Sequence, residues 1–420
     1  MKVYLGGINS CDVHCENTFL KAHIEGKGHE IVDFFEEADL IIISDTCIGS
    51  YHNFLVNMNF LKYVLEEKQT HAQVILSGCL SKGVKFELTE EQKNLLNSVT
   101  IVKPESIINY VSNMIGYDVN DEFIKNNSLP FNIDYHQIYT SVVDGCLNHC
   151  SFCKSNYMNF DLKSKPFELV ENLVKDLNEL NSPIYHIGLA SSNLTLYGVD
   201  LYNEQRAHKV INLMSKVKSL KFMSVGAMIN WYPELVEEIV SNPKIKTVFT
   251  SLESGSSRVY NLMNRPISLD DLIRVIKFIK KERPDIIINS EFICGFPTET
   301  INDLKRTLNL VEELDINPHF IWPYINSLQV PSSNLPQHSK EYLNHLKDYA
   351  IQKLMKVKNK FANQLENSEM VVAFKDMQFR CYITILINGG IRYIGFDELD
   401  RDYSIGEIIP ANTISRTRKL

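Results

Sequence analysis

The sequence predicts an α/β protein with three units: an N-terminal open parallel α/β sheet, a central incomplete (β/α)6 barrel and a small C-terminal all-β barrel. Short apolar runs alternate with longer amphipathic stretches over residues 1–130 and again over residues 138–330, which is typical of parallel sheets with helices between the strands. After residue 370 only short polar and glycine-containing segments separate the apolar runs. The expected boundaries are 1–130, 131–338, a connecting helix at 339–365, and 366–420.

Three cysteines of the N-terminal unit follow expected strands. The strands are expected at residues 2–6, 40–44, 73–78 and 99–102, and the helices near 16–27, 54–68, 90–97 and 105–115. Cys11, Cys47 and Cys79 each follow one of the first three strands. Because parallel strands end at one edge of a sheet, these thiols are expected to converge on an iron–sulfur site with one iron free. Cys15 could replace Cys11, and three separate buried cysteines are the alternative.

The central unit follows a polar stretch, residues 116–137, that is expected to be a linker. Its six expected strands are residues 138–143, 184–189, 221–226, 247–251, 286–292 and 319–324. The expected helices are residues 166–180, 204–218, 233–240, 269–281 and 299–314. Six β/α units indicate an incomplete barrel, with chemistry at the carboxyl ends of its strands.

A loop after the first central strand carries Cys146, Cys150 and Cys153 at the spacing C-x3-C-x2-C. Thiolates are soft ligands that suit iron–sulfur clusters, and three of them leave one corner of a 4Fe–4S cube open to a small molecule. The alternatives are three chance thiols or zinc, for which His149 is the nearby fourth donor, although a ligand there would crowd its neighbours. Cys294 and Cys381 are expected to be packed thiols.

The chain resembles the radical S-adenosylmethionine (SAM) methylthiotransferases, the family that thiomethylates tRNA bases or a ribosomal protein. The matching motifs run in order along most of the chain: Cys11, Asp45-Thr46-Cys47, Ser77-Gly78-Cys79, the 146–153 loop, Tyr197-Gly198-Val199-Asp200, Ser254-Gly255-Ser256-Ser257-Arg258-Val259, Met263-Asn264-Arg265 and Gly295-Phe296-Pro297-Thr298-Glu299. The motif at 197–202 is closer to the ribosomal-protein branch, which modifies an aspartate.

This resemblance implies two 4Fe–4S clusters and SAM as both methyl donor and radical source. The cluster on Cys146, Cys150 and Cys153 would cleave SAM reductively, and a second cluster on Cys11, Cys47 and Cys79 would carry the sulfur. An external electron donor similar to flavodoxin or ferredoxin, and sulfide or polysulfide as the sulfur source, are implied as well. The SAM-binding residues implied at the strand ends are Phe152, Ser192, Asn193, Ser251, Glu253, Gly295 and Phe296. The C-terminal unit would be a TRAM-like domain that presents the substrate.

Charge favours a polypeptide substrate over tRNA. The net charge is 43 − 51 = −8, and residues 366–420 carry seven basic and eight acidic side chains, whereas phosphate contacts require an excess of Lys and Arg. Three changes from the family pattern, Ser10, Ser192-Asn193 and Lys154 after the third cysteine, leave the substrate open. A tRNA adenosine, contacted by the lysine-rich stretch 353–360, is the first alternative, and a small peptide is another. The third is a non-catalytic RNA- or ribosome-binding metalloprotein.

The remaining expectations concern the setting of the protein. Nine cysteines without a signal peptide favour a reducing cytoplasm. No apolar run is long enough to cross a membrane. We expect a monomer.

Overall fold

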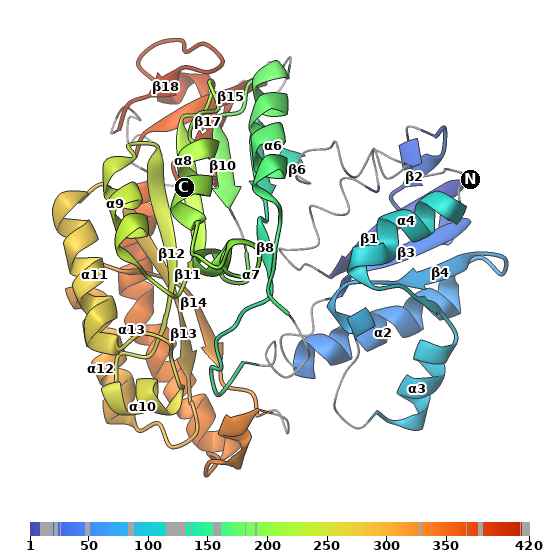
Figure 1. The fold of residues 1–420 in the computed structure, drawn as a ribbon, viewed down its shortest axis with the longest axis horizontal. Coiled ribbons are helices and arrows are strands. Elements are labelled where there is room, and N and C mark those ends of the chain that lie inside the picture. Colours follow the sequence, from blue (N-terminus) through green and yellow to red (C-terminus); the bar gives the residue numbers. More distant parts are fainter. Residues whose placement is uncertain are drawn as a thin grey trace.

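The computed structural model describes the chain except for residues 9–19, 21–23, 26, 47–50, 83–87, 115–131, 135, 154–160, 181, 190, 327–329, 367, 377–380, 412 and 414–420. The described residues form an α/β fold with two parallel sheets, as predicted, and a separate antiparallel sheet near the C-terminus. Figure 1 shows the N-terminal sheet in blue at one side of the central unit and the C-terminal strands in red at the top.

The N-terminal sheet has five parallel strands in the order β2-β1-β3-β4-β5. Its strands are β1 (Lys2–Ile8), β2 (Glu30–Val32), β3 (Leu40–Thr46), β4 (Gln73–Leu76) and β5 (Thr100–Ile101), and its helices are α2 (Tyr51–Glu67), α3 (Glu90–Asn97) and α4 (Pro104–Met114). In β3 the even-numbered Leu40 and Ile42 pack in one core cluster, whereas Ile41 and Ile43 pack in another. Both faces of β3 are therefore covered, which explains its continuous apolar run. The three-residue strand β2 was not predicted.

The central sheet has the order β14-β13-β12-β11-β10-β7-β6. Its strands are β6 (Asn132–Asp134), β7 (Gln137–Thr140), β10 (His186–Leu189), β11 (Phe222–Met228), β12 (Ile245–Glu253), β13 (Ile287–Cys294) and β14 (Asn317–Pro323). From β7 through β10 to β14 each strand pairs in parallel with the next strand of this sheet along the chain, as expected for successive β/α units. Two details differ from the prediction. The antiparallel strand β6 lies within the expected linker, and the expected strand 138–143 is divided into β7 and β8 (Val143–Asp144), which pairs with β9 (Lys163–Ser164).

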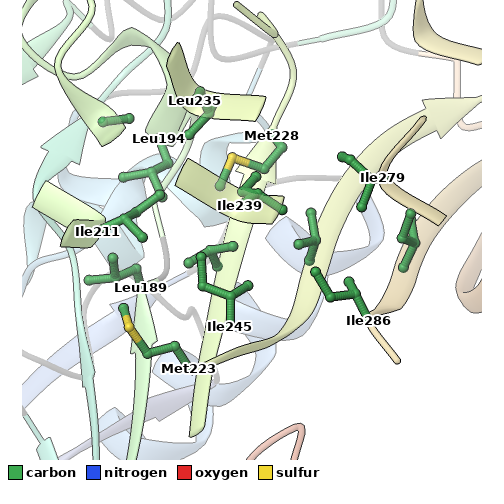
Figure 2. Packing of buried hydrophobic residues seen from close by; sticks show 14 of the residues in the cluster. Leu189, Leu194, Ile211, Met223, Met228, Leu235, Ile239, Ile245, Ile279 and Ile286 are labelled. Atoms are coloured by element: carbon green, nitrogen blue, oxygen red, sulfur yellow. The ribbon is translucent and has the colours of Figure 1, made fainter. Parts of the chain in front are cut away.

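Helices pack against one face of the central sheet. They are α6 (Phe167–Glu179), α8 (Ala207–Met214), α9 (Pro233–Ser241), α11 (Leu269–Glu282) and α12 (Ile301–Glu313), with short helices α7 (Val199–Tyr202) and α10 (Ser257–Leu262) between them. Figure 2 shows part of the resulting core, in which Leu189 and Met223 of the strands lie near Ile211 and Ile239 of the helices. The core forms because alternate strand residues face the helices and bury apolar surface there.

The C-terminal sheet is antiparallel, with the order β17-β16-β15-β18, and follows the long helix α13 (Lys340–Glu366). Its strands are β15 (Met370–Asp376), β16 (Cys381–Leu386), β17 (Ile391–Gly395) and β18 (Ile408–Ile409). Val371 and Ile385 of this sheet pack with Tyr185, Phe222 and Ile287, which lie at or just before the amino ends of central strands. The sheet is therefore attached at the end of the central strands opposite to the end that precedes the cysteine loop.

Gly389 lies at this junction, in the turn between β16 and β17. A substitution of Gly389 therefore tests how tightly the two sheets pack there. Its φ is +85°, and an added Cβ would lie 2.5 Å from both His186 Cε1 and Tyr139 Oη. We expect Gly389→Ala to lower the free energy of unfolding by about 2–4 kcal/mol, because the cost of the strained backbone adds to the cost of the steric clash. The control is Gly28→Ala, where φ is +75° but no atom lies within 4 Å of the added Cβ; it should cost about 1–2 kcal/mol. Urea unfolding monitored by circular dichroism measures both, and equal losses would contradict the tight junction.

Candidate functional site

The three cysteines lie in a loop just beyond β8, held by neighbouring backbone. Gly145 begins the loop with a φ of 76°, a conformation that favours glycine. The Ser151 amide donates to Met263 O at 2.9 Å, and Ser151 O accepts from the Ser332 amide at 3.0 Å. Asn264 Nδ2 donates to the carbonyl of His149 at 2.7 Å. These contacts, from residues more than a hundred positions away, fix the loop at the carboxyl end of the sheet.

The thiols of Cys146, Cys150 and Cys153 are unpaired by disulfides, and Cys150 is buried. Burial raises the pKa of the Cys150 thiol to about 11; the Arg265 guanidinium opposes this rise, and the neighbouring thiols add to it. Burial also raises the pKa of Cys146. Such sulfurs become thiolates only when cations or hydrogen-bond donors compensate the charge, and bound iron is a cation of the required kind.

Arg265 supplies one positive charge beside the loop. Its Nη1 donates to Cys150 Sγ at 3.1 Å, and its Nη2 donates to the carbonyl of Ser251 at 2.6 Å. The guanidinium carbon lies 5.9 Å from the centre of the Phe152 ring. Arg265 therefore connects the cysteine loop to the carboxyl end of β12.

Cys146 receives hydrogen bonds from an amide network. Asn193 Nδ2 donates to Cys146 Sγ at 3.3 Å, and the Asn148 backbone amide donates to the same sulfur at 3.4 Å. Asn230 Oδ1 accepts from Asn193 Nδ2 at 2.9 Å and from Asn148 Nδ2 at 2.7 Å. The Asn230 amide group donates in return to Asn148 Oδ1 at 3.0 Å, and the Thr195 hydroxyl donates to Asn193 Oδ1 at 2.5 Å. The network fixes both donors to Cys146, since each amide has a partner on either end.

The N–H groups aimed at two of the three sulfurs fit a thiolate-bound cluster. In the described part of the chain, no three His, Cys, Asp or Glu side chains are arranged to hold a single metal ion. A cube requires a wider arrangement, because each thiolate binds a different iron corner. The three-thiol donor set and its N–H donors are compatible with a 4Fe–4S cluster.

The other residues expected to bind SAM lie at the same carboxyl edge, where Ser192 is exposed just after β10. Ser251 and Glu253 end β12, and burial raises the pKa of Glu253 to about 7. Gly295 follows β13 with a φ of 80°, and its amide donates to Glu299 Oε2 at 2.5 Å. Phe296 is buried against Tyr324 and lies in the same small core cluster that Phe152 contacts. Asn193 is also there, but its amide contacts Cys146.

The expected second cluster site lies largely outside the described residues. Cys11, Cys47 and the alternative Cys15 are not described, and Cys79 is described only as the start of the short helix η2 (Cys79–Lys82). Of the two cysteines expected to be packed thiols, Cys294 is confirmed, because it lies in the main core and burial raises the pKa of its thiol to about 12. The side chain of Cys381 is not described.

Sequence reasoning assigned no role to Asn148, Asn230 or Arg265. Arg265 stands in a motif shared with the family, which was a signal for its importance but not for its contact with Cys150. Asn148 lies inside the cysteine loop. Asn230 follows β11 and is 82 residues away from Asn148 in sequence, so no local pattern could connect them.

One surface pocket adjoins the amide network through Asn230, and another lies away from it. The first, of about 600 Å³, is lined by residues that include Gln205, Asn230 and Trp231. The other, of about 720 Å³, lies between α9 and α11 and is mainly apolar. Neither pocket is lined by a cysteine. The candidate cluster site is therefore identified by its hydrogen-bond donors and not by a surface pocket. No described helix is long and apolar enough to span a membrane.

Comparison with known proteins agrees with the geometry. The radical SAM superfamily matches residues 140–311, which include all three loop cysteines. The ribosomal protein uS12 methylthiotransferase RimO of Clostridioides difficile (strain 630) is 27% identical over 368 residues, covering 83% of this chain and 80% of that protein. The tRNA-2-methylthio-N(6)-dimethylallyladenosine synthase of Thermotoga petrophila is 27% identical over 289 residues, covering 66% of this chain and 64% of that protein.

Among solved structures, the cobalamin-dependent SAM radical enzyme OxsB aligns over 94% of this chain and 64% of its own length, at 11% identity and a TM-score of 0.49. The sequence relatives are the informative matches, because several uS12 methylthiotransferases align over 72–83% of the chain. Radical SAM domains imply SAM and a 4Fe–4S cluster as cofactors. The chain is similar over most of its length to the radical SAM methylthiotransferases of ribosomal protein uS12, and these relatives support an enzyme of the methylthiotransferase type.

Proposed function

We propose that this enzyme attaches a methylthio group to an unactivated carbon of a side chain in ribosomal protein uS12. The observation that carries the proposal is the similarity to uS12 methylthiotransferases over most of the chain. The net charge of −8 supports it, because an acidic enzyme attracts basic ribosomal proteins more readily than it attracts RNA.

Cys146, Cys150 and Cys153 would hold the cluster, with Asn193, the Asn148 amide and Arg265 donating to the sulfurs of the first two. The bound cluster would supply the electron that cleaves SAM, and the resulting radical would remove hydrogen from the substrate carbon. The remaining SAM contacts would come from Phe152, Ser192, Ser251, Glu253, Gly295 and Phe296 at the carboxyl ends of the central strands. Cys150 is buried but Cys146 and Cys153 are half-exposed, so bound SAM and substrate would complete the exclusion of water that protects a radical from side reactions.

A second cluster would bind to Cys11, Cys47 and Cys79 and carry the sulfur. The support is topological. These cysteines stand three, one and three residues beyond the last residues of β1, β3 and β4, which are neighbours in one parallel sheet. Sulfide or polysulfide would supply the sulfur, and a flavodoxin- or ferredoxin-like protein the electrons.

The domain limits are proposed as 1–130, 131–338, 339–365 and 366–420. The parallel order from β7 to β14 supports an incomplete (β/α)6 barrel for the second, and the antiparallel order of the last four strands supports a TRAM-like barrel. A monomeric cytoplasmic enzyme is proposed, in line with its nine cysteines and the reducing conditions that iron–sulfur thiolates require.

Iron content tests the two-cluster proposal. After anaerobic reconstitution we expect about eight irons per chain, because each cube holds four. Changing Cys146, Cys150 and Cys153 together to alanine should leave about four. Changing Cys47 and Cys79 instead should also leave about four, with SAM cleavage retained. About four irons in the wild type would contradict the second cluster.

The hydrogen bonds to the sulfurs are tested by redox potential. Arg265→Gln should lower the reduction potential of the loop cluster, because a positively charged donor to Cys150 is lost. Asn230→Ala should lower it as well, because the donors to Cys146 lose the acceptor that orients them. We expect shifts on the order of 65–130 mV, since a hydrogen bond to a charged group contributes about 1.5–3 kcal/mol and about 59 mV corresponds to a tenfold change for one electron. Titration followed by electron paramagnetic resonance measures the shift. Exposed Arg274→Gln is the control, and unchanged potentials in both test variants would refute the role.

Mass spectrometry tests the substrate. Proteins and digested tRNA would be compared from cells with and without the gene, and from cells that carry the triple-alanine variant of the cysteine loop. We expect a methylthio group on a uS12 peptide only when the active gene is present. A methylthio group on a nucleoside with none on any peptide would instead support the tRNA synthase activity of the second group of relatives.

A further inference from the structure

The edge strand β14 exposes aromatic side chains on the face of the central sheet that the helices leave uncovered. Ile321 packs against the helix-side core, so its neighbours Phe320 and Trp322 point to the opposite face. Their side chains are 44% and 49% exposed. Large exposed aromatics side by side are uncommon on a surface that has no binding role.

A carboxylate lies among these rings. The pairing of β13 with β14 sets Glu291 opposite Phe320 and Ile293 opposite Trp322. The Trp322 indole Nε1 donates to Glu291 Oε2 at 3.0 Å. Glu291 is half-buried, and it has no ion-pair partner among the described residues.

Phe249 and His319 extend the group. Their rings meet edge to face with centres 5.1 Å apart, and the rings of Phe320 and Trp322 lie 5.2 Å apart at 33°. We call Phe249, Glu291, His319, Phe320 and Trp322 the aromatic–carboxylate cluster. Aromatic faces around an uncompensated carboxylate attract an ammonium or guanidinium group, through cation–π contact and a charge-assisted hydrogen bond.

The cluster is connected to the cysteine loop by neighbouring charges. Glu253 pairs across β12 and β13 with Phe292, the residue after Glu291. Glu253 lies within electrostatic reach of both Glu291 and Arg265, and Arg265 contacts Cys150. A segment bound at the cluster would thus lie on the same sheet face as the end of β12 that contacts the loop.

We propose that the aromatic–carboxylate cluster binds an arginine or lysine side chain of the polypeptide substrate and so sets which residue of that segment approaches the loop. This rests on the proposed function. Charge distinguishes the occupant, because the Glu291 carboxylate repels the phosphates of a nucleic acid and attracts a basic segment. The cluster would determine specificity and would take no part in the chemical step.

Fluorescence provides a direct test, since the chain has two tryptophans, Trp231 and Trp322. In the reconstituted Trp231→Phe enzyme, emission reports on Trp322 alone. The probes are synthetic 15-residue peptides that tile uS12, each paired with a neutral copy in which citrulline replaces arginine and acetyl-lysine replaces lysine. We expect a basic peptide to change the emission saturably and its neutral copy to bind about tenfold more weakly.

Variants distinguish binding at the cluster from a general effect of the protein's negative charge. Glu291→Gln keeps an acceptor for the Trp322 indole and removes the negative charge. It should weaken peptide binding and raise the KM for uS12 about tenfold, while SAM cleavage stays unchanged. Phe320→Leu keeps apolar bulk and removes the aromatic face, and it should also weaken binding. Exposed Glu234→Gln on α9 removes the same charge from the helix side and should change neither value.

The proposal is overturned if neutral peptides bind equally well, if Glu291→Gln matches the control, or if SAM alone gives the whole Trp322 response. If the Glu291→Gln enzyme still modifies uS12 with an unchanged KM, the cluster does not bind the substrate, and the proposed function stands. If the wild-type enzyme binds basic peptides but never modifies uS12, the proposed function is refuted instead.

Discussion

Hydrogen bonds to buried sulfur are the constraint on which the rest of this structure depends. Cys150 is buried, and a thiolate there is stable only with nearby positive charge and N–H donors. The residues that supply or orient these donors come from separate parts of the chain. Arg265, which follows α10, donates to Cys150, and Asn193, which follows β10, donates to Cys146. Asn230, which follows β11, accepts from Asn193 and holds its amide in place. Because the parallel strands of the central sheet end at one edge, residues that follow different strands meet at one short loop.

The sequence was sufficient to predict the strands whose positions depend on a local apolar pattern. Apolar runs located β3, β4 and β11 to β14 within a few residues, because continuous burial leaves a continuous apolar run. The rule that ligands bind at strand ends placed Ser251, Glu253, Gly295 and Phe296 at one edge, where the structure has them. It could not supply Asn230, whose importance comes from pairing with an amide 82 residues away. It also missed β2 and β6, which are too short to show a period.

Total charge described the C-terminal unit incompletely. A near-neutral balance argued against phosphate contacts, but it could not tell where the unit attaches. The attachment depends on apolar contacts, in which Val371 and Ile385 meet Tyr185 and Phe222. The lysine-rich helix before it is also partly structural, because Lys360 forms an ion pair with Asp315. Lysines committed in this way contribute little to binding a phosphate backbone.

The position of the C-terminal sheet constrains how a substrate could reach the loop. The sheet packs at the amino ends of the central strands, and the cysteine loop lies beyond their carboxyl ends. A substrate that touched both would have to extend along the strands. The strand face without helices runs in that direction, and it carries Glu291, Phe320 and Trp322. An extended basic segment suits this path better than a folded nucleic acid, because its side chains alternate along the strand direction and its charge is opposite to that of the face.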